Sequence, residues 1–393
     1  MTVTVQKTDR RLYEPYLRAK WGLKNHWYPA LFGVELPEGG VKGVEIAGTP
    51  ILLRRIKGRL YALHDRCVHR GVRLSHKPTC LTDDTITCWF HGFSYNLSDG
   101  MLMSIVGSPD DELIGKHKLR TFPVQEFRGI VFVFVGDEDY KPIPPLSDDL
   151  PVRPPKNDAY SAAHPLDEDA VILGIHTTVR CNWRLATENG FDPGHALVHR
   201  DNALVHALAG QRPQQLAYRP VSDDAFRVFE GDGPKGIMNM YGSDKYIPVT
   251  ENKALNLRSA TGTDFKFVGS RTSMYLPGVL MVENFPDPKV MHMEWYVPID
   301  DKTHEYWRCI VANCPDETAR ERFTYRYQNF YEPLDLRDFN NADVDASEAM
   351  QEVYERDGWN HENLFTLDAV LIGWRKLVSR YNRGIQAPPR GSE

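Results

Sequence analysis

Two short segments, each with one cysteine and one histidine, constrain the fold of this chain more than any other feature. The first is Cys67-Val-His69, and the second is Cys88-Trp-Phe-His91, with eighteen residues between them. Two thiolates and two imidazoles at such spacing are typical of a metal centre held by two loops. We therefore expect a rigid scaffold that presents both loops side by side.

Each pair combines one cysteine with one histidine, and this combination indicates the type of metal centre. A Rieske [2Fe-2S] cluster has two cysteines on one iron and two histidines on the other, so each loop supplies one ligand of each kind. The alternative is a structural Cys2His2 zinc site, whose usual patterns pair cysteine with cysteine and histidine with histidine. The mixed pairs favour the cluster, with Cys67, His69, Cys88 and His91 as its ligands.

Length and composition indicate a globular protein of two domains. The chain has 393 residues, of which 41% are hydrophobic and 25% charged. Its net charge is -6, so we expect neither nucleic acid nor an acidic membrane surface as a partner. The charged amino terminus has no apolar leader, and the remaining cysteines are too few for a disulfide framework, which predicts a cytoplasmic location.

Composition also predicts where the domains meet. Short β-rich runs separated by glycine turns fill residues 25–140, and six prolines follow within residues 141–156. We predict an α+β protein, with an all-β Rieske domain at 25–140, a linker at 141–156 and an α+β second domain at 157–384. This second domain is expected to be an antiparallel sheet covered by helices. Residues 1–24 are expected to pack on it, and residues 385–393 to form a flexible tail.

Patterns of apolar residues predict the individual elements. The first domain's strands are expected at 43–46, 51–53, 60–63, 85–90 and 129–136, and the second sheet's at 278–282, 291–297 and 306–311. Helices are expected at 316–330, 346–356 and 361–381.

A second metal constellation lies in the second domain. His195 and His199 are four residues apart, which places both imidazoles on one face of a helix. Two histidines and one carboxylate form the facial triad of non-haem iron(II) oxygenases. Residue types and spacing do not decide which carboxylate is the third ligand. The candidates are Asp335, Asp338, Asp343, Asp345 and Glu348. Asp192 is interpreted as the acid that accepts an imidazole N-H, or alternatively as a helix N-cap.

With both motifs in this order, the chain resembles the α subunits of Rieske non-haem iron ring-hydroxylating oxygenases. The resemblance runs from about Asn25 to the carboxyl-terminal helices, and Glu188-x3-Asp192-x2-His195-x3-His199 matches the family's catalytic motif. It implies one [2Fe-2S] cluster and one mononuclear Fe(II), bound by His195, His199 and Asp343. It also implies a homotrimer without a β subunit, in which Asp192 connects the cluster ligand His91 to His195 of a neighbouring subunit.

The resemblance also implies a substrate and an electron supply. Segments such as Asn25 to Pro29 and Gly373 to Leu377 are similar to the terminal oxygenases that act on carbazole. The implied reaction is angular dioxygenation of carbazole to 2'-aminobiphenyl-2,3-diol with O2. Electrons would come from a ferredoxin and, through it, from an NADH-dependent reductase. Phe339 and Phe285 are predicted walls of the substrate pocket, and the carbonyl of Gly190 is predicted to accept a substrate N-H.

Two other functions use the same motifs. A Rieske aromatic monooxygenase or O-demethylase would have the same metals but form a different product. A Rieske electron carrier would have no mononuclear iron, so about three irons and two acid-labile sulfides per chain would exclude it.

Overall fold

The computed structural model describes residues 10–152, 162–208, 217–221, 225–240, 246–258 and 271–389. These residues form two compact units. The β unit contains Leu23–Leu146 together with the residues after Ile385, and the α+β unit contains the residues before Leu23 together with Ser147–Ile385. None of the described helices is both long and apolar enough to cross a membrane.

The β unit consists of three antiparallel sheets, in the strand orders β1-β9-β8, β2-β3-β4 and β5-β6-β7. Their bounds are β1 His26–Phe32, β2 Val41–Ile46, β3 Thr49–Ile56, β4 Arg59–His64, β5 Thr85–Thr87, β6 Phe93–Asn96, β7 Leu102–Ile105, β8 Val124–Phe127 and β9 Ile130–Val135. A short 3-10 turn lies at η2 Gly33–Glu35, and η3 Leu146–Asp149 spans the point where the chain leaves the β unit. The predicted strand at 85–90 was too long, because Cys88, Trp89 and Phe90 leave the sheet to form a ligand loop.

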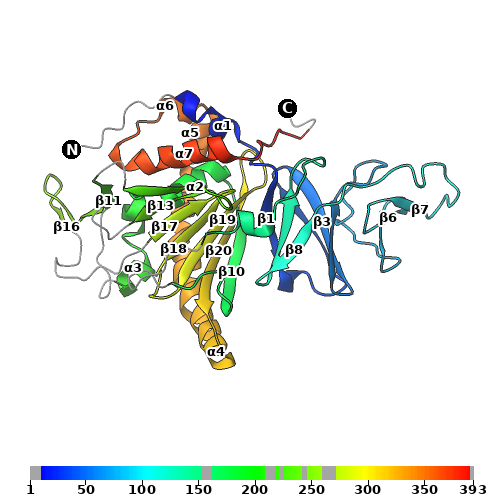
Figure 1. The fold of residues 1–393 in the computed structure, drawn as a ribbon, viewed down its shortest axis with the longest axis horizontal. Helices are drawn as coiled ribbons and strands as arrows, with labels where there is room; N and C mark the ends of the chain where they lie inside the picture. Colours follow the sequence, from blue (N-terminus) through cyan, green and yellow to red (C-terminus); the bar gives the residue numbers. More distant parts are fainter. Residues whose placement is uncertain are drawn as a thin grey trace. The chain divides into compact units, whose positions relative to one another are not determined.

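The main sheet of the α+β unit is antiparallel, and its described strands follow the order β10-β20-β19-β18-β17-β13-β12 (Figure 1). These strands are β10 Ala170–Val179, β12 Phe226–Phe229, β13 Gly236–Met240, β17 Arg271–Tyr275, β18 Val279–Glu283, β19 Met291–Pro298 and β20 His304–Asn313. Two small ribbons pair β11 Ala217–Pro220 with β14 Tyr246–Val249, and β15 Glu251–Asn252 with β16 Leu257–Arg258. An all-β domain followed by a sheet with helices confirms the predicted α+β class.

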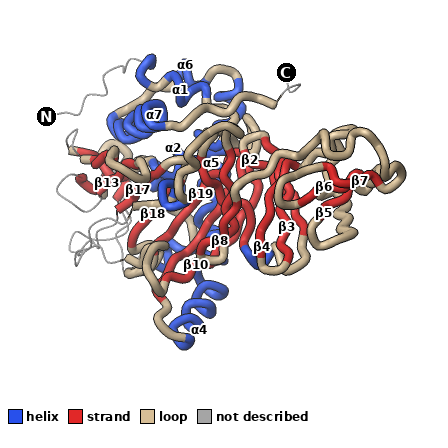
Figure 2. The backbone as a smooth tube through the Cα atoms, turned by 45° about the vertical axis from the view of Figure 1, so that its right-hand side comes forward, coloured by secondary structure: helices blue, strands red, loops and turns tan. Residues whose placement is uncertain are grey.

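Helices α2 (Trp183–Phe191) and α7 (Ala369–Tyr381) pack on one face of this sheet. Ile237, Met274, Leu280 and Glu294 lie opposite one another on successive strands and therefore share a face. Gly373 of α7 packs against Ile237, and Gly190 of α2 packs against Leu280. Helix α5 (Asn340–Glu355) packs against α2 (Figure 2).

The remaining helices are α1 Glu14–Arg18, η1 Arg10–Leu12, η4 His195–His199, α3 Ala203–Leu208, α4 Glu317–Arg326, η5 Tyr327–Phe339, α6 Gly358–His361 and η6 Thr366–Asp368. The predicted break between residues 330 and 346 was wrong. A π-helix, η5, with Pro333 inside it, joins α4 directly to α5. Proline removes an α-helical hydrogen bond, and the wider π-turns accommodate that loss without ending the helix.

Residues 10–22 pack on the helices of the α+β unit. Helix α1 contacts α7, as Figure 1 shows in blue and red. The Tyr16 hydroxyl donates to the backbone carbonyl of Arg184, and the Trp183 indole donates to the carbonyl of Ala19. This layer fixes the start of α2, the helix that leads into the His195–His199 segment.

Candidate metal centres

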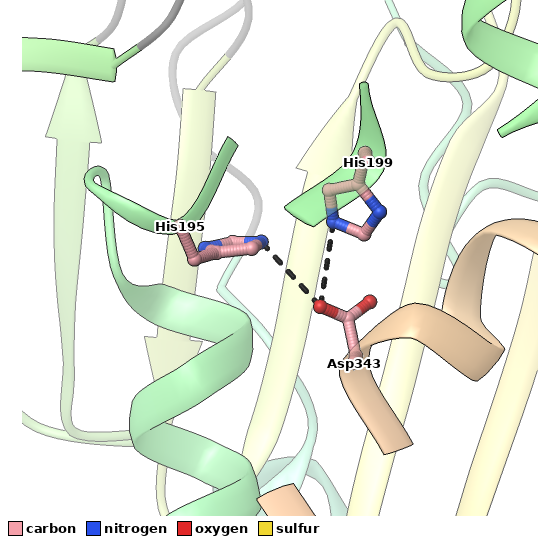
Figure 3. Close-up of side chains that lie close together, drawn as sticks. All are labelled: His195, His199 and Asp343. Atoms are coloured by element: carbon pink, nitrogen blue, oxygen red, sulfur yellow. Dashed lines mark ion pairs between the residues drawn. The ribbon is translucent and has the colours of Figure 1, made fainter. Parts of the chain in front are cut away.

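His195, His199 and Asp343 converge in the α+β unit. Each offers one ligand atom, and these atoms lie within 4.8 Å of one another. Asp343 Oδ1 is 3.5 Å from His195 Nε2 and 3.4 Å from His199 Nε2, and the three side chains point toward a common centre (Figure 3). They come from η4 and from the first turn of α5, so the fold brings a distant carboxylate to the paired histidines.

Neighbouring acceptors leave both Nε2 lone pairs free to bind a metal. His195 Nδ1-H donates to the backbone carbonyl of Asp192 at 2.5 Å, and His199 Nδ1-H donates to Asn202 Oδ1 at 3.2 Å. The Nε2 atom of His199 is buried and has no hydrogen-bond partner. Outer hydrogen bonds of this kind orient metal-ligating imidazoles. The donor set therefore fits a 2-His-1-carboxylate iron site.

The charge on Asp343 also suits a cation. Burial would raise the pKa of its carboxyl, but His199, His195 and the amide of Asn189 hold that pKa below its ordinary value. The carboxylate in turn raises the pKa of His199 against the lowering effect of burial. A metal would take the place of a proton on His199, because ligand binding requires neutral imidazole.

The expected conformation of this segment was wrong, whereas Asp192 accepts an imidazole N-H as expected, although through its backbone. The residues His195 to His199 form a 3-10 helix, whereas an α-helix was expected, although both rings still face Asp343, with centroids 5.2 Å apart. Asp192 contacts His195 through its backbone carbonyl, and its carboxylate accepts from Gly194 N at 2.7 Å. The alternative role of Asp192 as an N-cap was wrong, because this residue follows α2 as its C-cap. Burial raises the pKa of its carboxyl.

The other acidic candidates lie apart from the triad or serve other contacts. Asp335 Oδ2 is paired with His292 Nδ1, Asp338 accepts from the backbone of Ala203, and Glu348 accepts from the backbone of Arg180. Asp345 is exposed. Of the five candidates, Asp343 alone joins the two histidines.

The predicted pocket walls lie beside this centre. The Phe339 ring stacks on His199 at 3.7 Å between centroids, and Phe285 lies against Phe339 at 5.1 Å. Gly190 faces Tyr296, and a side chain at this position would collide with the Tyr296 hydroxyl. The two phenyl rings thus lie beside a candidate iron ligand, and Gly190 follows Asn189, which donates to Asp343; their contacts with substrate stay predictions.

Asn189 and Asn202 were not predicted, and they support the centre directly. Asn189 Nδ2 donates to Asp343 Oδ1 at 2.9 Å, and Asn202 orients His199. The sequence contained one signal for each, since Asn189 lies within the motif and Asn202 lies three residues after His199.

Glu188, the first residue of the motif, stabilises the helix that precedes the histidines. Its two carboxylate oxygens accept from Arg375 Nε and Nη2 at 2.9 and 2.7 Å, and Arg375 also pairs with Glu362. All of these groups are buried or nearly so. This two-sided ion pair fixes α2 to α7 and makes Glu188 a structural residue.

The two Cys/His loops of the β unit have the same backbone design. Gly71 N donates to the carbonyl of Cys67 at 2.8 Å, and Gly92 N donates to that of Cys88 at 2.9 Å. Both glycines have positive φ, at 71° and 73°, which L side chains rarely adopt. The matched turns explain why a glycine lies four residues after each cysteine.

These loops bring the four predicted ligands together. Cys67 and Cys88 are buried in the core of the β unit, with Leu52 and Ile86, whereas His69 and His91 are exposed. The histidine Nδ1 atoms are 3.1 Å apart. The Tyr95 hydroxyl lies 3.1 Å from Cys67 Sγ and accepts from Val68 N. Buried thiols and exposed imidazoles on paired loops suit a cluster with one iron facing the interior and one facing outward.

Comparison with known proteins agrees with both centres. Residues 26–123 match a family model described as the Rieske [2Fe-2S] domain, and residues 134–386 match one described as homotrimeric ring hydroxylase. The terminal oxygenase component of carbazole 1,9a-dioxygenase from Metapseudomonas resinovorans is 41% identical over 95% of this chain and 94% of its own length.

Two groups of solved structures are similar over nearly the whole chain. A component of 2-oxoquinoline 8-monooxygenase has a TM-score of 0.93 and 48% identity, covering 99% of this chain and 93% of its own. A carbazole-bound oxygenase in complex with ferredoxin, from carbazole 1,9a-dioxygenase, has a TM-score of 0.85 and 39% identity, covering 98% and 96% respectively.

Proposed function

Because this chain belongs to the homotrimeric Rieske ring-hydroxylating oxygenases, we propose that it is a terminal oxygenase that hydroxylates a fused, nitrogen-containing aromatic ring with O2. The observation that carries this proposal is the convergence of His195, His199 and Asp343 beside an aromatic wall. A Rieske domain alone would only transfer electrons, whereas a mononuclear iron at this second site would use them to activate O2.

His195, His199 and Asp343 would hold the mononuclear iron, and Cys67, His69, Cys88 and His91 would hold the cluster. When bound, the iron activates dioxygen and the cluster supplies electrons to it. Phe285 and Phe339 would place a flat substrate beside the iron and exclude water. Asn202 and the carbonyl of Asp192 keep the two imidazoles in the tautomer that binds metal.

Electron supply would come from outside this chain. A ferredoxin, reduced by an NADH-dependent reductase, would reduce the cluster, and the solved carbazole oxygenase in complex with ferredoxin supports that partner. Within the trimer, His91 of one subunit would pass the electron through Asp192 to His195 of its neighbour. Asp192 is half-buried and its carbonyl already binds His195 Nδ1-H, which suits it to that position. Six unpaired cysteines are consistent with a cytoplasmic location.

Carbazole is the first specific candidate substrate. Angular dioxygenation would add both atoms of O2 across a ring bond, and the product would open to 2'-aminobiphenyl-2,3-diol. The similarity to carbazole oxygenases over nearly the whole chain supports this reaction. The Gly190 carbonyl is a candidate acceptor for the ring N-H.

Monooxygenation of 2-oxoquinoline is a second candidate, and one observation favours it. The 2-oxoquinoline monooxygenase component has both higher identity and a higher TM-score than the carbazole oxygenase structure. The two reactions use the same metals and differ in how many oxygen atoms enter the product, so product identification distinguishes them.

The test supplies the iron-loaded protein with ferredoxin, reductase, NADH and either carbazole or 2-oxoquinoline, followed by mass spectrometry. The Asp343→Ala variant is the control for chemistry that does not need the iron. A diol derived from carbazole supports dioxygenation, and a product with one added oxygen from 2-oxoquinoline supports the second candidate. If neither substrate yields an Asp343-dependent product while both metals are bound, the proposed substrate class is wrong.

A further inference from the structure

A buried ionic cluster lies behind the aromatic wall, formed by His292, Glu294 and Asp335. His292 Nδ1 is 2.9 Å from Asp335 Oδ2, and its Nε2 is 2.7 Å from Glu294 Oε1. All three residues are at most 3% exposed. His292 and Glu294 are alternate residues of β19 on the face toward the helices, and Asp335 lies in the π-helix η5.

The central histidine carries a positive charge. Burial lowers the pKa of His292, but the carboxylates of Asp335 and Glu294 raise it further, to about 10. Buried charges are costly to desolvate, and a well-packed apolar group is often as stable in their place. Stability alone therefore accounts poorly for three ionisable groups at this position, and their contacts with the pocket wall offer a second reason for them.

On one side, the cluster determines the position of Phe339. Asp335 precedes Phe339 by four residues in η5, and Asn340 follows it directly. Asn340 Nδ2 donates to Glu294 Oε1 at 2.9 Å. Strand β19 is thus bonded to the helix both before Phe339, at Asp335, and after it, at Asn340. The Phe339 ring between these two contacts stacks on His199. The same helix carries Asp343 one turn later, and π-turns are frequent at functional sites.

On the other side, the cluster contacts Phe285. The Phe285 ring meets the His292 imidazole edge to face, at 5.8 Å between centroids and 65° between planes. An imidazolium beside an aromatic ring gains a cation-π attraction, which a neutral imidazole lacks. His199, Phe339, Phe285 and His292 therefore form a continuous row of rings from the candidate iron ligand to the ionic cluster.

We propose that His292, Glu294 and Asp335 are positioning residues that set the orientations of Phe285 and Phe339, and thereby which atom of the substrate faces the iron. Their link to substrate orientation rests on the proposed function. Their control of the two rings does not.

The test compares Glu294→Gln, which keeps the shape and removes the charge, with His292→Gln and a matched control, His176→Gln. His176 pairs with Glu305 at 2.6 Å across β10 and β20. Crystal structures of each variant would report the orientations of Phe285 and Phe339. Steady-state assays on the substrate identified above would report kcat, KM, the ratio of hydroxylated isomers and the peroxide released per NADH.

We expect Glu294→Gln and His292→Gln to reorient at least one phenyl ring, change the isomer ratio, raise peroxide release and lower kcat/KM by about 10- to 100-fold. Iron and cluster content should stay at the wild-type level. The His176→Gln control should keep both rings and the isomer ratio unchanged.

Unchanged rings and an unchanged isomer ratio in both cluster variants would overturn the proposal. The same changes in the His176→Gln control would also overturn it, because they would reflect general loss of stability. If the wild-type protein hydroxylates neither substrate, the proposed function fails, and the ring orientations still decide whether the cluster positions the wall.

Discussion

Gly190→Ala should destabilise the α+β unit through a single collision. A Cβ atom at this position would lie far inside the van der Waals contact distance of the Tyr296 hydroxyl oxygen, and 3.1 Å from Leu280 Cδ2. The same hydroxyl donates to Glu294 Oε2, so moving it also disturbs that hydrogen bond. Overpacking costs about 1–3 kcal/mol, and the gain in helix propensity from glycine to alanine offsets about 1 kcal/mol.

The hydrogen bond to the carboxylate adds about 1.5–3 kcal/mol if it breaks. We therefore expect the unfolding free energy to fall by about 1.5–5 kcal/mol if this bond breaks, and each kcal/mol lowers Tm by about 2–4 °C. Thermal and urea unfolding of the purified variant measure this loss.

The Tyr296→Phe variant isolates the cause. It removes the colliding oxygen and leaves Tyr296 Cζ 3.2 Å from the new methyl group, a distance that small shifts accommodate. The double variant should therefore be more stable than the sum of the two single losses predicts, by about 1–2 kcal/mol. If the two losses simply add, the collision with the hydroxyl is not the reason for the glycine, and the reasoning is refuted.

Three further predictions follow from the two centres and the buried cluster. Asp343→Ala should lower the iron content from about three to about two per chain and leave the Rieske absorbance intact; loss of the cluster signal would contradict two independent centres. Tyr95→Phe removes the hydroxyl 3.1 Å from Cys67 Sγ and should lower the reduction potential of the cluster, since hydrogen bonds to sulfur favour the reduced form; voltammetry showing an unchanged potential would count against that bond. The pKa of His292 is about 10 in the folded protein, above the ordinary value of about 6.5, so its stabilising effect is complete below about pH 6.5 and is lost as the pH rises through about 10. The difference in Tm between wild type and His292→Gln should shrink over that range, and a difference that grows with pH would be the opposite of the expected sign.

Short motifs made much of both centres predictable. Cys67, His69, Cys88 and His91 lie in two short segments, so residue types and spacing alone were enough to predict them as metal ligands. His195 and His199 were predicted in the same way. Their 3-10 conformation was not predicted, because a spacing of four residues suits an α-helix and the local turn depends on Asp192 and Gly194 packing around it.

Asp343 shows where reasoning from residues alone stops. The separation between a histidine pair and its carboxylate is determined by the sheet and helices between them, so five acidic residues remained possible until the family resemblance favoured one. The π-helix had a misleading signal, since Pro333 is typical of a helix end. No sequence pattern indicated the cluster of His292, Glu294 and Asp335, because its members meet only after β19 and η5 pack together.

The most direct test of the oxygenase assignment is a single turnover with isotopically labelled dioxygen. The protein is reduced, separated from ferredoxin and reductase, and mixed with substrate and the labelled gas. We predict that label from O2 enters the hydroxylated product of the wild-type protein and that Asp343→Ala forms none. A product without label, or a labelled product from the Asp343→Ala variant, would contradict the assignment of oxygen chemistry to this site.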